Sequence, residues 1–230
     1  MRFLGLKFPS LNSRSLETNA VAHAPENIGF YLDQNGLGNI RQPGKKMTVW
    51  QRTLPNAMTH FLNGLCLPMP RQQQFVWHAD DDISLLLNPA LASFSQSKCM
   101  GFKAWREDIL HLLQYCRQLS PKQEIKVRLE SVSSNGCRLF HTDKIGLRVL
   151  CTYRGEGTLW IPEHAIDRTR QDRSNNSHVL DASAVESLGT GWVACLKGDA
   201  YPGEYDTGIF HRSPPAAIEA QRILLAIDLH

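Results

Sequence analysis

The spacing of apolar residues changes at Pro121, and this change limits the choice of fold more than any other feature of the chain. Before Pro121 the apolar residues recur every three or four positions, as in "KAWREDILHLLQYCRQL", which is typical of amphipathic helices. After it they alternate with polar residues, as in "EIKVRLESV" and "LRVLCTY", which is typical of half-buried strands. A mainly helical half followed by many short strands predicts an α+β protein.

Two helices are predicted before the one that ends at Ser120. The stretch "MTVWQRTLPNAMTHFLNGLCL" from Met47 onward predicts a helix interrupted near Pro55. In "HADDDISLLLNPALASF" the aspartates Asp80 to Asp82 are expected to cap a helix, because carboxylates accept the free amides of its first turn.

These sequence patterns predict the boundaries of the segments and of the domain. Residues 1–45 are rich in Ser, Asn, Gly and Pro, so we expect an irregular segment there. Residues 46–230 are expected to form a single domain, with a helical layer over 46–120 and a β core over 121–230. The strands predict an antiparallel sandwich or barrel, and the polar residues 163–187 predict a loop with short helices.

Composition excludes several classes of function. The net charge of +3 comes from 25 basic and 22 acidic residues without a basic block, so there is no strong signal for nucleic-acid binding. Six cysteines without a C-x-x-C pair favour neither a zinc ribbon nor a disulfide framework. No stretch approaches the roughly 18 apolar residues of a membrane span. We therefore expect a soluble cytoplasmic protein that does not interact with a membrane.

The motif "HTD" in "CRLFHTDKIGLRVLCTY" places His141 and Asp143 two residues apart in a strand-like stretch. Alternate side chains of a strand share a face, so the two would present an imidazole and a carboxylate side by side. The chain has nine histidines, so one such pair by chance is about an even bet. A second pair, His78 and Asp80, precedes a helix, where capping explains its acidic residues.

Downstream residues offer partners for the first pair. "GIFHRSPPAAIEAQRILLAIDL" predicts a hairpin, and a turn near residues 216–217 would set His211 opposite Arg222 on one face. Two histidines and one carboxylate are the facial set that binds non-haem Fe(II), which predicts His141, Asp143 and His211 as metal ligands. Arg222 is expected to hold a dicarboxylate through a charge-assisted pair.

Four further residues are candidates for binding. Alternation counted from Asp143 places Tyr153 on the metal-facing side, where it would contact a cosubstrate. The same counting turns Arg148 away from the metal unless a bulge intervenes, in which case it joins the candidates for substrate binding. Arg212 and Ser213 flank His211 and are expected to meet substrate at the mouth of the cavity.

The order His141-x-Asp143, His211 and Arg222 resembles the pattern of the Fe(II)- and 2-oxoglutarate-dependent oxygenases over residues 125–230. The resemblance implies a double-stranded β-helix, a jelly-roll or cupin-like core, with Fe(II) on the three ligands. It also implies 2-oxoglutarate on Arg222. The sequence departs from the pattern in one respect, because no Ser or Thr stands two residues after Arg222.

A second resemblance covers most of the chain. The stretches "VWQRTLP", "FHTDKIGLRVLCTYRGEGTLWIP", "AIDR", "LKGDAYPGE", "HRSPP" and "RILLAID" resemble signatures of the bacterial family known as domain of unknown function 1826. The resemblance implies no activity. It implies a functional link to metal-handling GTPases and a role when metal is scarce.

Two alternatives to an oxygenase stay open. The same ligands suit a cupin-like protein that binds Zn(II) for metal homeostasis, in which Arg222 would be structural. A scaffold of the same fold without metal is the third interpretation. The sequence has no G-x-S-x-G, P-loop, G-x-G-x-x-G or H-E-x-x-H motif to indicate other chemistries.

Overall fold

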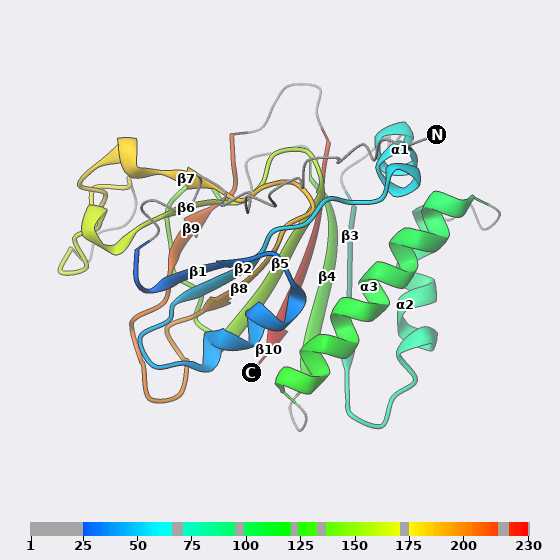
Figure 1. The fold of residues 1–230 in the computed structure, drawn as a ribbon, viewed down its shortest axis with the longest axis horizontal. Coiled ribbons are helices and arrows are strands. Elements are labelled where there is room, and N and C mark those ends of the chain that lie inside the picture. Colours follow the sequence, from blue (N-terminus) through cyan, green and yellow to red (C-terminus); the bar gives the residue numbers. More distant parts are fainter. Residues whose placement is uncertain are drawn as a thin grey trace, which may run out of the picture.

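The computed structural model describes residues 25–65, 71–94, 99–120, 124–132, 137–170, 175–215 and 221–229. Within these residues two β-sheets and a layer of helices surround two main apolar cores. Figure 1 shows the large sheet in the middle, with the helices α2 and α3 on one side and the small sheet on the other. No helix in these ranges is long and apolar enough to cross a bilayer.

The large sheet has seven strands in the order β1-β2-β8-β5-β10-β4-β3. All neighbouring strands are antiparallel except β1 and β2, which are parallel. The C-terminal strand β10 lies between β5 and β4, so the last strand of the chain is an interior strand of the sheet. The strands are β1 (Ile28–Tyr31), β2 (Met47–Trp50), β3 (Arg71–Trp77), β4 (Ile125–Val132), β5 (Leu147–Arg154), β8 (Val193–Lys197) and β10 (Arg222–Leu229).

The small sheet has three antiparallel strands in the order β7-β6-β9. They are β7 (Glu186–Ser187), β6 (Leu159–Ile161) and β9 (Phe210–Arg212). Trp160 of β6 packs in the apolar core formed by one face of the large sheet, so the two sheets share this core. The outer side of the small sheet is covered by its own cluster around Phe140 and Phe210.

Three α-helices cover the other face of the large sheet: α1 (Asn56–Gly64), α2 (Ile83–Leu91) and α3 (Met100–Leu119). The Asp82 side chain accepts a hydrogen bond from the Ser84 amide at 2.8 Å, which confirms the predicted cap of α2. Short 3-10 helices complete the structure: η1 (Gln34–Arg41), η2 (Ala92–Phe94), η3 (Glu163–Ala165) and η4 (Ala182–Ala184).

Alternation along β10 decides which side chains face which core. Ile223, Leu225, Ile227 and Leu229 pack into the core beneath the helices. Leu224 and Ala226 pack into the core shared by the two sheets. The face between the sheets therefore carries Arg222 at one end of β10 and Asp228 near the other.

The strands of the first half were not foreseen. Residues 47–50, expected to start a helix, form β2, and the helix α1 begins only at Asn56 after Pro55. All of Met47, Thr48 and Val49 are buried, so this strand lacks the alternation that identifies a half-buried one. β1 lies in the segment expected to be irregular, of which residues 1–24 are outside the described ranges. β3 lies in the expected helical layer.

Several predictions near and after Pro121 are confirmed. The helix predicted to end at Ser120 is α3, which ends at Leu119. The stretches "EIKVRLESV" and "LRVLCTY" lie in β4 and β5, and the strands predicted to carry His211 and Arg222 are β9 and β10. The predicted hairpin of His211 and Arg222 is wrong, because β9 pairs with β6 in the small sheet while β10 pairs with β4 and β5 in the large one. The proposed turn at residues 216–217 falls outside the described residues.

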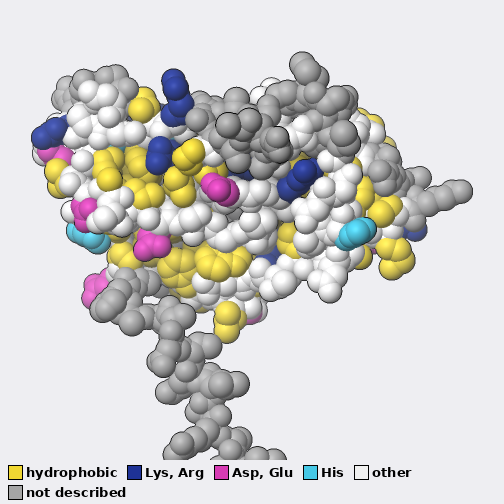
Figure 2. Space-filling view, turned by 90° about the horizontal axis from the view of Figure 1, so that it is seen from above, with side chains coloured by type: hydrophobic (Ala, Val, Ile, Leu, Met, Phe, Trp, Pro, Cys, Tyr) yellow, Lys and Arg dark blue, Asp and Glu magenta, His cyan; other side chains and the backbone are white. Residues whose placement is uncertain are grey.

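Charge on the surface is dispersed. On the face shown in Figure 2, the Lys and Arg side chains of the described residues lie apart from one another, interspersed with acidic and apolar ones.

Candidate metal centre

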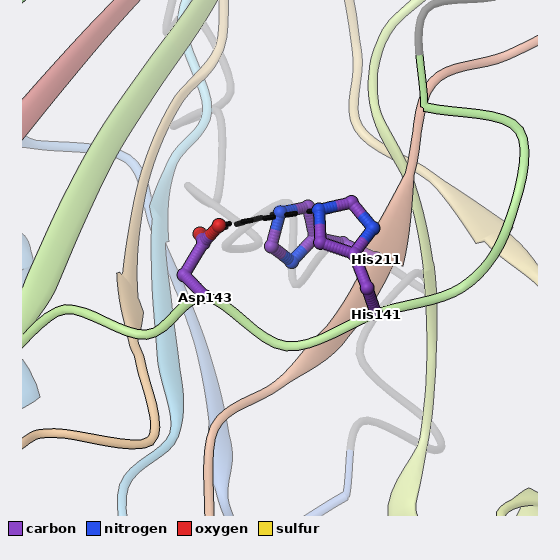
Figure 3. A group of neighbouring side chains, drawn as sticks. All are labelled: His141, Asp143 and His211. Atoms are coloured by element: carbon purple, nitrogen blue, oxygen red, sulfur yellow. Dashed lines mark ion pairs between the residues drawn. The ribbon is translucent and has the colours of Figure 1, made fainter. Parts of the chain in front are cut away.

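His141 and His211 meet because the chain pairs them directly. Each donates its backbone amide to the other's carbonyl, at 3.1 Å from His141 and 3.0 Å from His211, which makes an isolated antiparallel bridge. Directly paired residues in such a bridge project to one face, so both imidazoles point the same way. Their ring centroids are 4.7 Å apart. Asp143 follows two residues after His141 and turns its carboxylate toward both rings, as Figure 3 shows.

The distances in this cluster suit a single metal ion. The Nε2 atoms of His141 and His211 lie 4.0 Å and 3.3 Å from the Asp143 carboxylate, and one ligand atom from each residue lies within 4.8 Å of the others. Metal bonds of about 2.1 Å place neighbouring ligand atoms roughly 3 Å apart, so small side-chain movements suffice. Asp143 and His211 are buried whereas the His141 side chain is 35% exposed, so the cluster is reached from the His141 side.

Backbone carbonyls fix the tautomer of both imidazoles. The Nδ1 atom of His141 lies 3.0 Å from the Leu139 carbonyl oxygen, and that of His211 lies 3.1 Å from the Ile209 carbonyl oxygen. A carbonyl only accepts, so each Nδ1 carries the hydrogen and each Nε2 presents a lone pair. Burial lowers the pKa of His211 to about 4, so this imidazole is neutral at pH 7 and ready to bind a cation.

Arg148 orients the Asp143 carboxylate. Its Nη1 donates to Asp143 Oδ1, while its Nε and Nη2 donate to the two oxygens of Asp228 at 2.6 and 2.9 Å. Burial opposes the charge of this guanidinium, but the hydrogen bond to Asp228 and the attraction of Asp143 outweigh it and raise the pKa of Arg148. One Asp143 oxygen is thus engaged and the other, Oδ2, faces His211.

The expected orientation of Arg148 away from the ligands is therefore wrong. The reason is that residues 142–146 leave the strand geometry before β5 begins at Leu147, so alternation cannot be counted across them.

The loop of residues 198–208 forms hydrogen bonds with the segment that carries His141 and Asp143. The Asp199 amide donates to the Asp143 carbonyl at 2.7 Å. The Asp199 side chain accepts from Thr142 Oγ1, from Lys144 Nζ at 2.7 Å and from the Gly208 amide at 3.0 Å. Burial would raise the pKa of Asp199, but these donors lower it. Asp199 is only 7% exposed, so its carboxylate is part of the support of the ligand segment and not of a solvated surface.

Arg222 lies on the same internal face with hydroxyl partners. Its Nη2 donates to Thr152 Oγ1 at 3.0 Å and to Thr158 Oγ1 at 2.7 Å. The sequence has no hydroxyl two residues after Arg222 on β10. The structure supplies two from elsewhere, because Thr152 lies in β5 and Thr158 directly precedes β6. Burial lowers the pKa of Arg222 to about 10, so the guanidinium is still charged at pH 7.

Three other candidate residues lie elsewhere. Tyr153 faces the helices and donates its hydroxyl to Asp108 Oδ2 of α3 at 2.6 Å, which corrects the expected contact with a cosubstrate. Arg212 points to the outer side of the small sheet, over the Phe140 ring, because its neighbour His211 points inward. Ser213 lines a pocket that does not include the three ligands.

The donor set fits a divalent transition metal. Two neutral imidazoles and one carboxylate on one side of an ion leave its other positions open, as in the facial sites of non-haem Fe(II) proteins. Zinc accepts the same ligand types. The structure thus defines a class: a mixed α and β protein with a large sheet, a small sheet and a His-Asp-His cluster able to hold a metal.

Within this class, the chain belongs to the family described as Protein of unknown function (DUF1826), whose model matches residues 32–228. This confirms the family suggested by the sequence motifs. No curated protein matches the sequence.

Several solved structures are similar to the chain. One is the dioxygenase for auxin oxidation 1 of Arabidopsis thaliana with 2-oxoglutarate, at 12% identity and a TM-score of 0.45, covering 88% of this chain and 91% of the other. A second is IDO of Bacillus thuringiensis, at 13% identity and a TM-score of 0.42, covering 77% and 81%. A third is a cupin protein of Bacteroides fragilis, at 15% identity and a TM-score of 0.27, covering 46% and 64%.

Proposed function

We propose that this protein is a non-haem oxygenase of the hydroxylase type that depends on Fe(II) and 2-oxoglutarate. His141, Asp143 and His211 would hold the iron, and Arg222 would hold the distal carboxylate of 2-oxoglutarate. The support comes from one internal face of the protein, which carries the ligand cluster toward one end and a buried guanidinium at the other.

The strand order supports a double-stranded β-helix as the core. In the large sheet β4, β10, β5 and β8 are adjacent, and β9, β6 and β7 form the small sheet that shares a core with it. The bridge of His141 to His211 extends the small sheet by one more paired segment. Two such sheets enclosing a ligand space are the architecture of jelly-roll and cupin proteins. The strands β1, β2 and β3 then flank this core.

The observation that carries the proposal is the state of Arg222. It is only 7% exposed, and its Nε makes no hydrogen bond to a described residue. Glu130 attracts the guanidinium, but no described carboxylate forms an ion pair with it. A buried cation without a paired anion is costly, and the cost is offset when an anion binds. A carboxylate accepting from the guanidinium, with the Thr152 and Thr158 hydroxyls beside it, would supply the missing charge.

The residues of the centre have separable roles. When bound, iron with 2-oxoglutarate supplies oxidation of a substrate C–H bond by O2, coupled to decarboxylation of the cosubstrate to succinate. The chain contributes binding and orientation: carbonyls hold the hydrogen on both Nδ1 atoms, so that the Nε2 atoms are the ones presented to the metal, and Arg148 holds the Asp143 carboxylate. Leu224 and Ala226 make the internal face of β10 apolar beyond Arg222.

Anaerobic titration tests the proposal. Fe(II)-loaded protein should develop a weak visible charge-transfer band when 2-oxoglutarate is added, and admission of air should yield succinate. In Arg222→Gln the 2-oxoglutarate concentration for half-maximal absorbance should rise at least about tenfold, because a charge-assisted pair is lost. Arg106→Gln, which changes an arginine on α3 that donates to Asn88 at 2.9 Å, is the matched control and should leave it unchanged.

Two results would count against the oxygenase. Absence of both the band and succinate would reject it. Tight Zn(II) binding by the wild type, lost in His211→Ala, with no response to 2-oxoglutarate in either form, would instead identify a zinc-binding protein with the same ligands.

A further inference from the structure

A pocket of about 740 Å³ opens beside the start of β10, away from the three metal ligands. Its walls come from the ends of β4, β5 and β10, from the segment that enters α1 and from the residues that follow β9. None of His141, Asp143 or His211 lines it. A volume of this size is in the range of sites for small organic molecules.

The lining of the pocket is cationic. Three arginines, Arg52, Arg154 and Arg222, contribute to it, and Glu156 is the one acidic residue among the described residues that line it. Asp108 neutralises Arg52 through two hydrogen bonds, at 2.5 and 2.7 Å. The charges of Arg154 and Arg222 are not neutralised in this way, because neither forms an ion pair within the described ranges.

Both of these guanidiniums have N–H donors for which no described residue is an acceptor. Arg154 uses Nη1 for the carbonyls of Leu62 and Leu65, at 3.1 and 2.8 Å, and no described residue accepts from its Nη2 or Nε. The buried Nε of Arg222 also has no acceptor among the described residues. A guanidinium presents its donors as a planar fork that matches a carboxylate or a phosphate. Two such groups at one pocket call for a negatively charged ligand.

Part of the remaining wall is apolar and suits a flat apolar body. Leu54, Trp192, Pro214 and Pro215 form this part, while threonine, asparagine and serine side chains line the rest. Trp192 packs edge-on to Phe30, with ring centroids 6.3 Å apart, so it is held in place as a wall. Apolar walls with a few convergent charges are typical of sites for small organic ligands.

We infer that this pocket is a second binding site, for an organic anion that carries a carboxylate or a phosphate on a flat apolar body. Arg154 anchors the anionic group, and Arg222 forms the wall shared with the internal face between the sheets. Binding at this site needs no metal. Arg222 is shared with the proposed 2-oxoglutarate site, so variants of Arg154 and Glu156 are the ones that test this pocket separately from the oxygenase proposal.

The experiment measures affinity by calorimetry for three probes of one shape: 2-naphthoate, 2-naphthyl phosphate and the neutral 2-naphthamide. The full-length protein is first stripped of metal with EDTA, so that the His-Asp-His cluster contributes nothing. At least one anion should bind about tenfold more tightly than the amide, because it adds charge-assisted hydrogen bonds. The comparison of naphthoate with naphthyl phosphate then identifies the anionic group.

Two variants locate the binding. Arg154→Gln should weaken the preferred anion about tenfold and leave the amide unchanged. Glu156→Gln should tighten the anion, because it removes the negative charge from the lining, and this gain does not depend on a damaged fold. Arg106→Gln, outside the pocket, should have no effect. Equal affinity for the anions and the amide, or anion binding that neither pocket variant alters, would overturn the inference.

Discussion

At the scale of single residues, the Asp143 carboxylate connects the ligand cluster to the large sheet. One oxygen accepts from Arg148, which in turn is held by both oxygens of Asp228 on β10. The other oxygen lies 3.3 Å from His211 Nε2. This arrangement leaves one oxygen for a metal, so we expect Asp143 to bind through a single oxygen. Arg148 is therefore a positioning residue for the centre.

Arg148→Gln should lower metal affinity about 10- to 100-fold, which is the usual effect of removing a group that orients a metal ligand. The physical reason is that Asp143 loses the donor that fixes its rotamer. Calorimetric titration of the metal-free protein with Co(II) measures the effect, and Arg106→Gln is the matched control. An unchanged Co(II) affinity in Arg148→Gln would show that Asp143 does not need this support.

At the scale of elements, the ligand segment 141–146 rests on the loop that follows β8. A Cβ atom on Gly198 would lie 2.3 Å from the Ile145 carbonyl oxygen and 2.8 Å from that of Asp143, so no larger residue fits there without displacement. The amides of Gly198, Asp199 and Ala200 all donate to carbonyls of residues 143–146. The position of Asp143 thus depends on a glycine in another element.

Gly198→Ala should shift the ligand segment and weaken Co(II) binding, although neither the ligands nor their hydrogen-bond donors are changed. Gly64→Ala at the end of α1 is the control, since nothing lies within 4 Å of its added Cβ. Calorimetry on both variants makes the comparison. Equal Co(II) affinity in the two variants would contradict the proposed dependence of Asp143 on the loop.

The contacts of Glu163 in η3 should contribute to the pH dependence of the free energy of unfolding. Burial would raise the pKa of Glu163 in η3, but hydrogen bonds from Arg168 and Lys46 outweigh it and lower the pKa. The folded state then holds this proton less tightly than the unfolded state, so the contribution is present above the ordinary pKa of 4.5 and disappears as pH falls through the lowered value.

Glu163→Gln should accordingly lower the free energy of unfolding at pH 7, and the difference from the wild type should shrink below pH 4.5. Urea unfolding of both proteins at several pH values measures it. A difference that stays constant with pH would mean that the charge of Glu163 contributes nothing. The side chain is 37% exposed, so the effect should be small and should decrease further in high salt.

The individual strands and helices also show which local sequence patterns are sufficient to predict secondary structure. The alternation in β4 and β5 was enough to predict strands, and the cap of α2 was visible in Asp82. The polar strand β3, "RQQQFVW", and the buried strand β2 lack such a pattern, because neighbouring strands and cores rather than their own sequence define them. The side of Tyr153 was misassigned because the loop before β5 interrupts the alternation.

At the scale of the whole molecule, the two sheets bring together residues that are distant in the sequence. The types and spacing of His141, Asp143 and His211 predicted that their side chains would meet, and the structure brings them together. The partners Arg148, Asp228 and Asp199 were missed, since strand register between β5 and β10 cannot be read from one sequence. The same limit produced the incorrect hairpin of His211 and Arg222, which lie in different sheets.

We propose that iron at the His-Asp-His cluster and 2-oxoglutarate between this cluster and Arg222 bind together. Diffraction at the iron absorption edge, from crystals grown without oxygen in Fe(II) and 2-oxoglutarate, tests this arrangement. One iron atom is expected on Nε2 of His141, Nε2 of His211 and one oxygen of Asp143, with the distal carboxylate of the cosubstrate on Arg222. Iron bound elsewhere, or a cosubstrate that does not reach Arg222, would contradict it.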